Sequence, residues 1–216
     1  MKIFIDMDGV LVDFQKGASD FINGALESGQ DYGSKSLGKL LQLDAQGNVP
    51  DITPEYLSYL LQLKDSKSPR TKVEKAVSNA VFSATGVGGS NWWANLPQAD
   101  GARELIDTCI AMVGIQNVYI MTAPTDDASI DGKIIWINKN FPQIDDVTNM
   151  FVSHEKGDYV SSNNPGKCIL IDDRIKYTTQ WQEAGGFPVL HDPPASTQGV
   201  RNSLNAIRNY ILEVGE

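Results

Sequence analysis

The sequence contains little of what disulfide scaffolds and zinc sites are built from. Only two cysteines, Cys109 and Cys168, and two histidines occur among its 216 residues. Tetrahedral zinc sites need cysteine or histidine ligands at short, regular spacing, and His154 and His191 do not provide it. Both cysteines lie in apolar stretches. We therefore expect two reduced core thiols, with neither a disulfide nor a zinc ion.

Basic residues and long apolar runs are also scarce. The chain has 18 lysines and arginines against 27 aspartates and glutamates, a net charge of −9. That balance argues against a nucleic acid polymer or an anionic membrane as a partner, but not against a small phosphorylated substrate held with a divalent cation. No apolar run is long enough to cross a bilayer, and the first residues lack the basic region and cleavage site of a secretory signal. We expect a cytoplasmic protein.

The first half of the chain has the pattern of helices. Between residues 15 and 90 the apolar positions recur at helical spacing, and no stretch alternates as a strand would. Thr53 precedes Pro54, which is typical of an N-cap followed by proline in the first turn. The predicted helices cover residues 15–28, 37–43, 54–63 and 73–81, and residues 86–90 are predicted as a flexible hinge.

From about residue 100 the pattern changes to strands that alternate with helices. With the run at residues 2–5, the predicted strands are 118–121, 150–152, 168–171 and 188–190, and the predicted helices are 102–113, 130–140, 178–184 and 203–212. Such alternation is typical of a parallel sheet covered on both faces. The sequence therefore predicts an α/β fold: a three-layer, Rossmann-like core of residues 1–14 and 91–216, with a small all-helical cap of residues 15–90 inserted after the first strand.

The most informative motif, DMDGVL at residues 6–11, follows the first predicted strand. Two carboxylates two residues apart at the end of a buried strand are costly unless a cation lies between them. Gly9 allows a sharp turn and brings backbone N–H groups close to a ligand. A nucleophilic Asp6, a proton-transferring Asp8 and a Mg²⁺ ion bound by both would account for the motif.

Two further predicted strands end in oxygen-bearing residues. Thr122 ends one, and the pair Asp172-Asp173 ends another. Ligands bind at the carboxyl ends of parallel strands, so we expect these side chains to meet Asp6 at one edge of the sheet. Oxygen-only ligands favour Mg²⁺ over a transition metal. Capping of the next helix explains any one of these residues, but it does not account for three strand ends at once.

This arrangement resembles the haloacid dehalogenase superfamily over most of the chain. The motifs of that superfamily are matched, in order along the chain, by Asp6, Asp8, Gly9 and Leu11, by Thr122, and by the pair Asp172-Asp173. For its lysine motif Lys156 is the best placed residue and Lys133 the competing one. The resemblance implies that Asp6 attacks phosphorus and becomes an aspartyl phosphate. It also implies that Asp8 protonates the leaving oxygen and then deprotonates the water that releases phosphate.

Phosphoryl transfer mainly requires positioning and neutralisation of charge. We expect Mg²⁺ to be held by Asp6, by the Asp8 carbonyl and by one aspartate of the acidic pair, with the choice between the two left open. Thr122, the adjoining Ala123 and the lysine would complete a cradle for the phosphate. An aspartate at position 8 favours phosphate-ester hydrolysis over dehalogenation, which would not need that acid.

Within that superfamily the chain is most similar to the 5′(3′)-deoxyribonucleotidases. The similarity lies in residues 10–14, 91–93 and 170–174. In those relatives aromatic rings at the positions of Phe14 and Trp93 sandwich the nucleobase, and Trp92 is a further candidate wall. Packing of Phe14 in the cap and of the tryptophans at the hinge is the competing interpretation. Ala123 stands where the relatives usually carry a serine, and Thr125-Asp126-Asp127 stand where they carry a basic residue. Their further aromatic pair in the cap has no clear match between residues 30 and 60, so base preference does not carry over.

Three functions follow from these expectations. The first is a Mg²⁺-dependent phosphomonoesterase for nucleoside monophosphates, and the second is a phosphatase with the same chemistry for a sugar phosphate or another metabolite. The third is a protein that binds a metal or a ligand without turnover, and the complete set Asp6, Asp8, Thr122 and Asp173 argues against it. A homodimer is left open.

Overall fold

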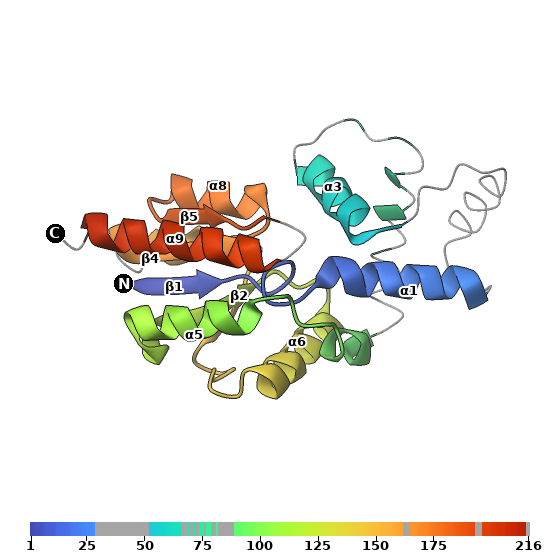
Figure 1. Cartoon of the computed structure of the whole chain (residues 1–216), viewed down its shortest axis with the longest axis horizontal. Coiled ribbons are helices and arrows are strands. Elements are labelled where there is room, and N and C mark those ends of the chain that lie inside the picture. The colour runs from blue at the N-terminus through green and yellow to red at the C-terminus, as the bar shows by residue number, and fades with distance from the viewer. Residues whose placement is uncertain are drawn as a thin grey trace.

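The computed structural model describes residues 1–28, 52–65, 69, 71, 74–75, 77–78, 81, 89–161, 165–192 and 196–214. These residues include one parallel sheet, with strands β1 (Lys2–Ile5), β2 (Val118–Thr122), β3 (Met150–Val152), β4 (Cys168–Asp172) and β5 (Phe187–Leu190). The strand order is β3-β2-β1-β4-β5, with β1 in the middle (Figure 1). The order reverses at β1, and the carboxyl ends around such a point form the usual ligand site of open α/β sheets. The predicted α/β fold is confirmed.

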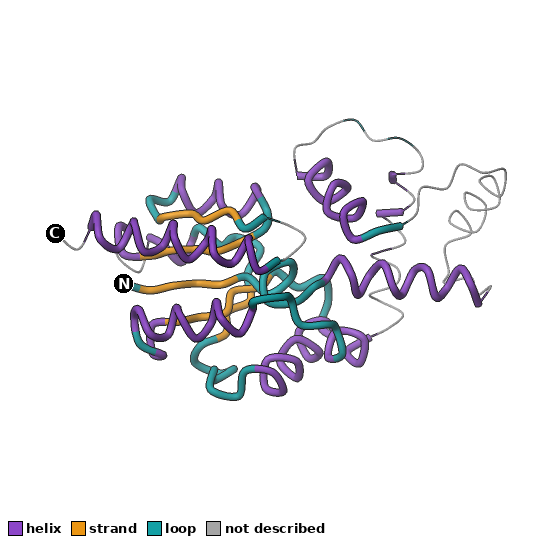
Figure 2. The backbone as a smooth tube through the Cα atoms, viewed as in Figure 1, coloured by secondary structure: helices purple, strands orange, loops and turns teal. Residues whose placement is uncertain are grey.

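Helices cover both faces of this sheet (Figure 2). Ile3 and Ile5 of β1 are buried in a core cluster that includes residues of several helices, while Phe4 packs on the opposite side against Trp181. Both faces of β1 are therefore apolar, as in other parallel sheets. The helices of the first face are α5 (Ala102–Val113), α6 (Asp127–Asn140) and α9 (Thr197–Val214). Those of the second are α7 (Asp158–Ser161) and α8 (Ile175–Glu183), and 3₁₀ turns at Ile115–Asn117 and Pro165–Lys167 precede β2 and β4.

Two helices lie beyond the carboxyl end of β1. The first, α1 (Phe14–Ser28), extends away from the sheet, and α3 (Pro54–Asp65) packs against it (Figure 1). The Ser19 hydroxyl and the Asn23 amide of α1 both donate to the Ile52 carbonyl, the latter over 3.2 Å. These contacts join α1 to the segment that leads into α3. The boundaries of the cap at residues 15 and 90 stay a prediction.

The described residues correct the predicted hinge in part. Residues 37–43 and 86–88, where a helix and most of the hinge are predicted, lie outside the described residues. Gly89 and Ser90 are helical, as are residues 91–94, so this end of the predicted hinge is not a flexible connector. Five residues of the predicted helix 73–81 are described, namely 74, 75, 77, 78 and 81, and all five are helical.

Several helices begin earlier than their apolar spacing predicts, because polar caps start them. The Asp126 carboxylate accepts from the Ser129 N–H over 2.8 Å, so α6 begins at Asp127 instead of residue 130. The Ser196 hydroxyl accepts from the Gly199 N–H over 3.1 Å, so α9 begins six residues before the predicted start. None of the helices in the described part of the chain combines the length and hydropathy needed to span a bilayer.

Candidate active site

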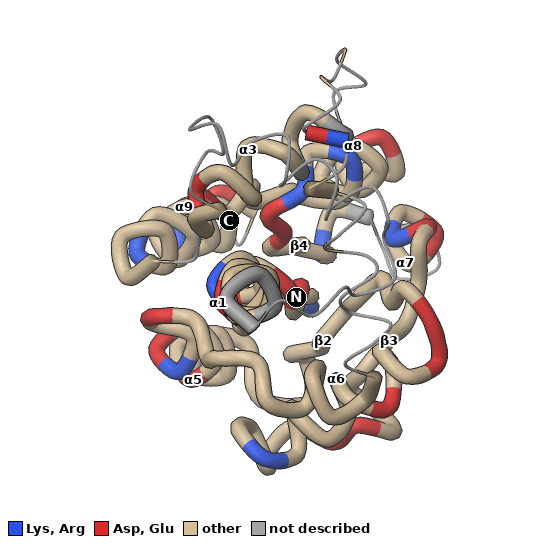
Figure 3. Tube along the Cα trace, turned by 90° about the vertical axis from the view of Figure 1, so that its right-hand side faces the viewer, with Lys and Arg blue, Asp and Glu red and all other residues tan. Residues whose placement is uncertain are grey.

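The predicted residues meet at the carboxyl edge of the sheet. Asp6 follows β1, Thr122 ends β2 and Asp172 ends β4, and these three strands are neighbours. Figure 3 looks at these strand ends and shows an acidic stretch followed by a basic one beside β4. A cavity of about 90 Å³ opens here, and Asp6, Asp8 and Asp173 are among its lining residues.

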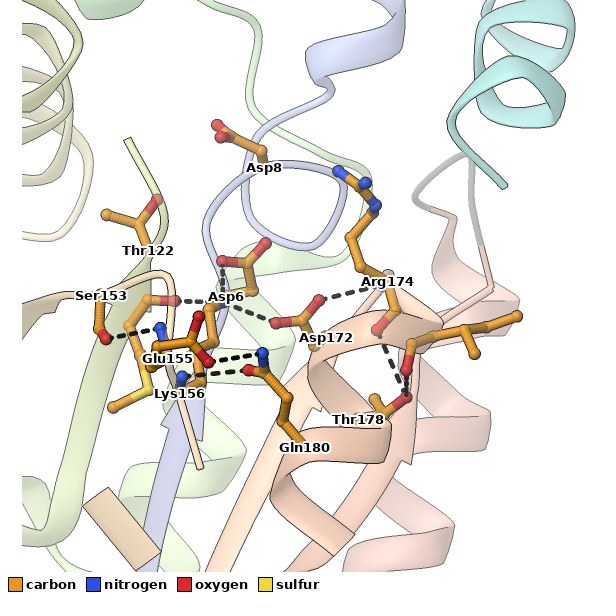
Figure 4. Close-up of polar contacts among 12 residues, drawn as sticks. Asp6, Asp8, Thr122, Ser153, Glu155, Lys156, Asp172, Arg174, Thr178 and Gln180 are labelled. Carbon is orange, nitrogen blue, oxygen red and sulfur yellow. Dashed lines mark hydrogen bonds and ion pairs between the residues drawn. The ribbon is translucent and has the colours of Figure 1, made fainter. Parts of the chain in front are cut away.

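Lys156 lies at the centre of the carboxylates (Figure 4). Its Nζ donates to Asp6 Oδ1 over 2.6 Å, to Asp172 Oδ2 over 2.6 Å and to the Met121 carbonyl over 2.8 Å. The side chain is fully buried, and burial alone would lower the pKa of Lys156. The Asp172 and Asp6 carboxylates outweigh that effect and raise the pKa, so the ammonium stays charged.

Lys133, the competing choice for the motif lysine, also reaches the site. From α6 its Nζ donates to Asp8 Oδ2 over 2.6 Å and to Thr122 Oγ1 over 2.7 Å, and it lies 4.7 Å from the centre of the Trp93 ring. Both lysines are fully buried, and they pair with different carboxylates. The two sequence alternatives are therefore not exclusive: Lys156 contacts the candidate nucleophile, and Lys133 contacts the candidate acid.

Asp8 has the properties of a group that exchanges a proton. Burial raises the pKa of its carboxyl, Lys133 opposes that rise, and the nearby Asp6 charge adds to it. One oxygen, Oδ2, is bound by Lys133, while Oδ1 is buried and has no hydrogen-bond partner among the described residues. A carboxyl with a raised pKa and one oxygen left for a ligand is suited to general acid and base chemistry.

The loop that carries Asp6 and Asp8 requires a glycine at position 9. Gly9 has φ 79°, a conformation that L-residues with side chains rarely adopt. A Cβ at Gly9 would also lie 2.3 Å from Oδ2 of Asp173. The Gly9 N–H donates to the Val12 carbonyl over 2.8 Å, which closes the loop. Gly9 therefore lets the first motif and the acidic pair approach each other.

Three carboxylates are close enough to share one cation. Ligand oxygens of Asp6, Asp172 and Asp173 lie within 4.8 Å of one another. Both oxygens of Asp172 are already occupied, Oδ2 by Lys156 and Oδ1 by the Arg174 N–H over 2.9 Å. Both oxygens of Asp172 thus accept hydrogen bonds within the protein. The sequence, in contrast, leaves open whether Asp172 or Asp173 binds the metal.

Asp173 differs from Asp172 in having almost nothing to balance its charge. It is 6% exposed, and the hydrogen bond to it from a described residue is a long one of 3.5 Å from the Gln15 amide. Burial first, and then the Asp172 and Asp6 charges, raise the pKa of Asp173 well above its usual value, while Arg174 opposes them. A divalent cation would reverse this penalty, so the carboxylates of Asp6 and Asp173 fit a hard cation such as Mg²⁺.

The aromatic residues do not form the open sandwich that the resemblance implies. Phe14 and Trp93 both line the cavity, but their rings stack on each other with centroids 5.7 Å apart and planes 25° apart. A base between them would need a separation of about 7 Å, twice the carbon contact distance of ~3.5 Å. Trp92 does not line this cavity, because neighbouring helical residues point in different directions, and it lines a separate groove beside Gly17 and Phe21.

Gln15, Thr125 and Tyr177 line the cavity and were not predicted as site residues. Arg174, which follows the acidic pair and lies directly before α8, lines the cavity too. Burial raises the pKa of Tyr177 to about 12, and its ring lies 4.6 Å from the Lys156 ammonium.

Comparisons with known proteins give similarity of architecture only. No protein-family model and no curated protein matches the chain. A haloacid dehalogenase-like protein of unknown function from Agrobacterium tumefaciens is 11% identical, with a TM-score of 0.48 over 99% of this chain and 98% of that one. A haloacid dehalogenase family hydrolase from Deinococcus radiodurans, with bound phosphate and sodium, is 13% identical, with a TM-score of 0.48 over 99% and 96%. The hydrolase YfnB from Bacillus subtilis, bound to magnesium, is 15% identical, with a TM-score of 0.46 over 94% and 97%.

Proposed function

We propose that this protein is a Mg²⁺-dependent phosphomonoesterase of the haloacid dehalogenase type, which transfers a phosphoryl group first to Asp6 and then to water. The observation that carries the proposal is the contact of a buried Lys156 ammonium with the Asp6 carboxylate, 2.6 Å apart. A second buried ammonium, that of Lys133, lies 2.6 Å from Asp8. Two buried cations beside two carboxylates favour an anion with several charged oxygens as the ligand.

In the first step a carboxylate oxygen of Asp6 forms a bond to phosphorus while the bond from phosphorus to the ester oxygen breaks. Asp8 gives its proton to that leaving oxygen. In the second step Asp8 takes a proton from water, whose oxygen attacks phosphorus, releases phosphate and restores Asp6. Lys156 already donates to Asp6, to Asp172 and to the Met121 carbonyl, so we expect it to hold Asp6 in position. We expect Lys133 and Thr122 to donate to the phosphoryl oxygens. When bound, Mg²⁺ supplies further positive charge to those oxygens.

For the substrate we propose a nucleoside monophosphate, because aromatic rings of Phe14 and Trp93 line the cavity beside the carboxylates. A second candidate is a sugar phosphate or a similarly small ester. The ring contact between Phe14 and Trp93 favours it, since the two rings leave no gap for a base between them.

Release of phosphate from a panel of deoxynucleotides, ribonucleotides, sugar phosphates and an aryl phosphate tests both candidates. Each is measured with Mg²⁺ and with a chelator. We expect turnover that requires Mg²⁺, and the preferred class identifies the leaving group. Binding of Mg²⁺ without release of phosphate from any ester would instead support the binding protein and contradict the proposal.

A further inference from the structure

Gln15 is a buried polar residue with only half of its hydrogen-bonding capacity used. It is the second residue of α1, it is 1% exposed, and it lines the cavity. Its Nε2 lies 3.5 Å from Oδ2 of Asp173. Its Oε1 is buried and has no hydrogen-bond partner among the described residues. The amide nitrogen of Gln15 therefore faces the Asp173 carboxylate, while its carbonyl oxygen has no donor among the described residues.

A buried carbonyl without a donor has lost its hydrogen bonds to water and gained none in return, so it destabilises the fold unless a ligand supplies a donor. The carboxylate that Gln15 contacts, that of Asp173, is an acceptor when ionised, so it cannot supply the missing hydrogen bond, and neither can the Asp6 carboxylate close to it. A cation held between those carboxylates changes this, because Mg²⁺ keeps several water ligands and each of them donates. The unpaired Oε1 of Gln15 belongs to the same amide group as Nε2, which contacts the proposed metal ligand Asp173.

We infer that Gln15 is a positioning residue for the metal site: its amide orients Asp173, and its carbonyl oxygen accepts from a water bound to the cation. The inference rests on the metal site of the proposed function. Gln15 lies in α1, the helix that follows the DMDGVL motif. Through Gln15, α1 would therefore take part in metal binding and connect the cap to the cation. Partners of this kind set ligand orientation, and removing one typically weakens metal binding about 10–100-fold.

The test is calorimetric titration of metal-free protein with Mg²⁺ and with Mn²⁺. Gln15→Met keeps the length of the side chain and removes both hydrogen-bonding groups. We expect its Kd to rise about 10–100-fold. Gln116→Met makes the same change at an exposed position and should leave Kd unchanged. Gln15→Asn keeps the amide but shortens it, and it should also weaken binding, so it serves if the methionine variant does not fold.

Equal metal affinity in wild type and in the Gln15 variants overturns the inference. So does an unchanged metal Kd with a raised KM, since Gln15 would then contact the leaving group instead. If the wild type itself binds neither metal, the proposed function loses its metal site. That outcome is distinguishable, because it appears before any variant is compared.

Discussion

The ammonium of Lys156 lies 2.6 Å from Oδ1 of Asp6, although 150 positions separate the two residues in the chain. It lies equally close, at 2.6 Å, to Oδ2 of Asp172. One buried cation thus joins the end of β1 to the end of β4. The candidate nucleophile is held by an interaction that also stabilises the centre of the sheet, so function and stability are coupled at this residue.

The first prediction concerns Lys156. Lys156→Met leaves the Asp6 and Asp172 carboxylates buried without their cation, and breaking such a pair costs about 3–5 kcal/mol. Urea unfolding at neutral pH measures the loss. Lys16→Met is the control, because Lys16 forms an ion pair with Asp20 over 2.7 Å at the surface, where solvent screens the two charges and little stability depends on the pair. Similar losses in both variants would show that the buried contact is not formed.

The second prediction compares two glycines. Gly9→Ala should destabilise the protein by more than 1 kcal/mol, of the order of the ~1–2 kcal/mol cost of this backbone conformation, and weaken Mg²⁺ binding, because the new methyl group meets Asp173. Gly24→Ala in α1 should stabilise it by roughly 0.5–1 kcal/mol, since nothing lies within 4 Å of the new Cβ. Unfolding free energies of the two variants should change with opposite signs. A neutral Gly9→Ala would contradict the loop geometry.

The third prediction separates the two aspartates of the acidic pair. Asp173→Asn should stabilise the metal-free protein, because it removes a buried carboxylate whose pKa is raised by burial and by its acidic neighbours. The same change should abolish the stabilisation that Mg²⁺ gives to wild type. Asp172→Asn should lower the stability of the metal-free protein, since Asp172 accepts from Lys156 and from Arg174 N–H. Thermal unfolding with and without Mg²⁺ checks all three statements, and the reverse assignment would appear as the opposite pattern.

The fourth prediction concerns His191, a buried residue outside the site. Burial lowers its pKa to about 4, and Nδ1 lies 3.0 Å from the Ser203 hydroxyl. This histidine is neutral in the folded protein and has a pKa near 6.5 in the unfolded chain, so its contribution to the free energy of unfolding is fully present above pH 6.5. That contribution, roughly 3 kcal/mol, is lost as the pH falls toward 4. Urea unfolding at several pH values should therefore show that the stability difference between wild type and His191→Asn shrinks over this range. A difference that does not change with pH would contradict the prediction.

The sequence was sufficient to predict the sheet and the gathering of Asp6, Thr122 and Asp172, because parallel strands bring their carboxyl ends to one edge. It could not choose between Lys133 and Lys156. Their positions depend on how α6 and the loop after β3 pack, which no local pattern encodes. The structure brings both lysines to the site, on different carboxylates.

The aromatic residues and the helix starts show a different kind of limit. Stacking of Phe14 on Trp93 depends on the distance between α1 and residues 89–94, which sequence spacing does not contain. The early starts of α6 and α9, in contrast, were readable from Asp126 and Ser196, since capping residues were present in the sequence. Gln15 was overlooked because a single polar residue in a helix gives no sign of burial.

The most direct test of the account is to trap the phosphoryl group on Asp6. The protein is mixed with its best substrate from the panel, quenched in acid during turnover, digested and analysed by mass spectrometry. We expect a phosphorylated peptide containing residues 1–16, with the phosphoryl group on Asp6, and no turnover by a folded Asp6→Asn variant. Turnover by that variant, with the peptide unmodified at every quench time, would contradict the account.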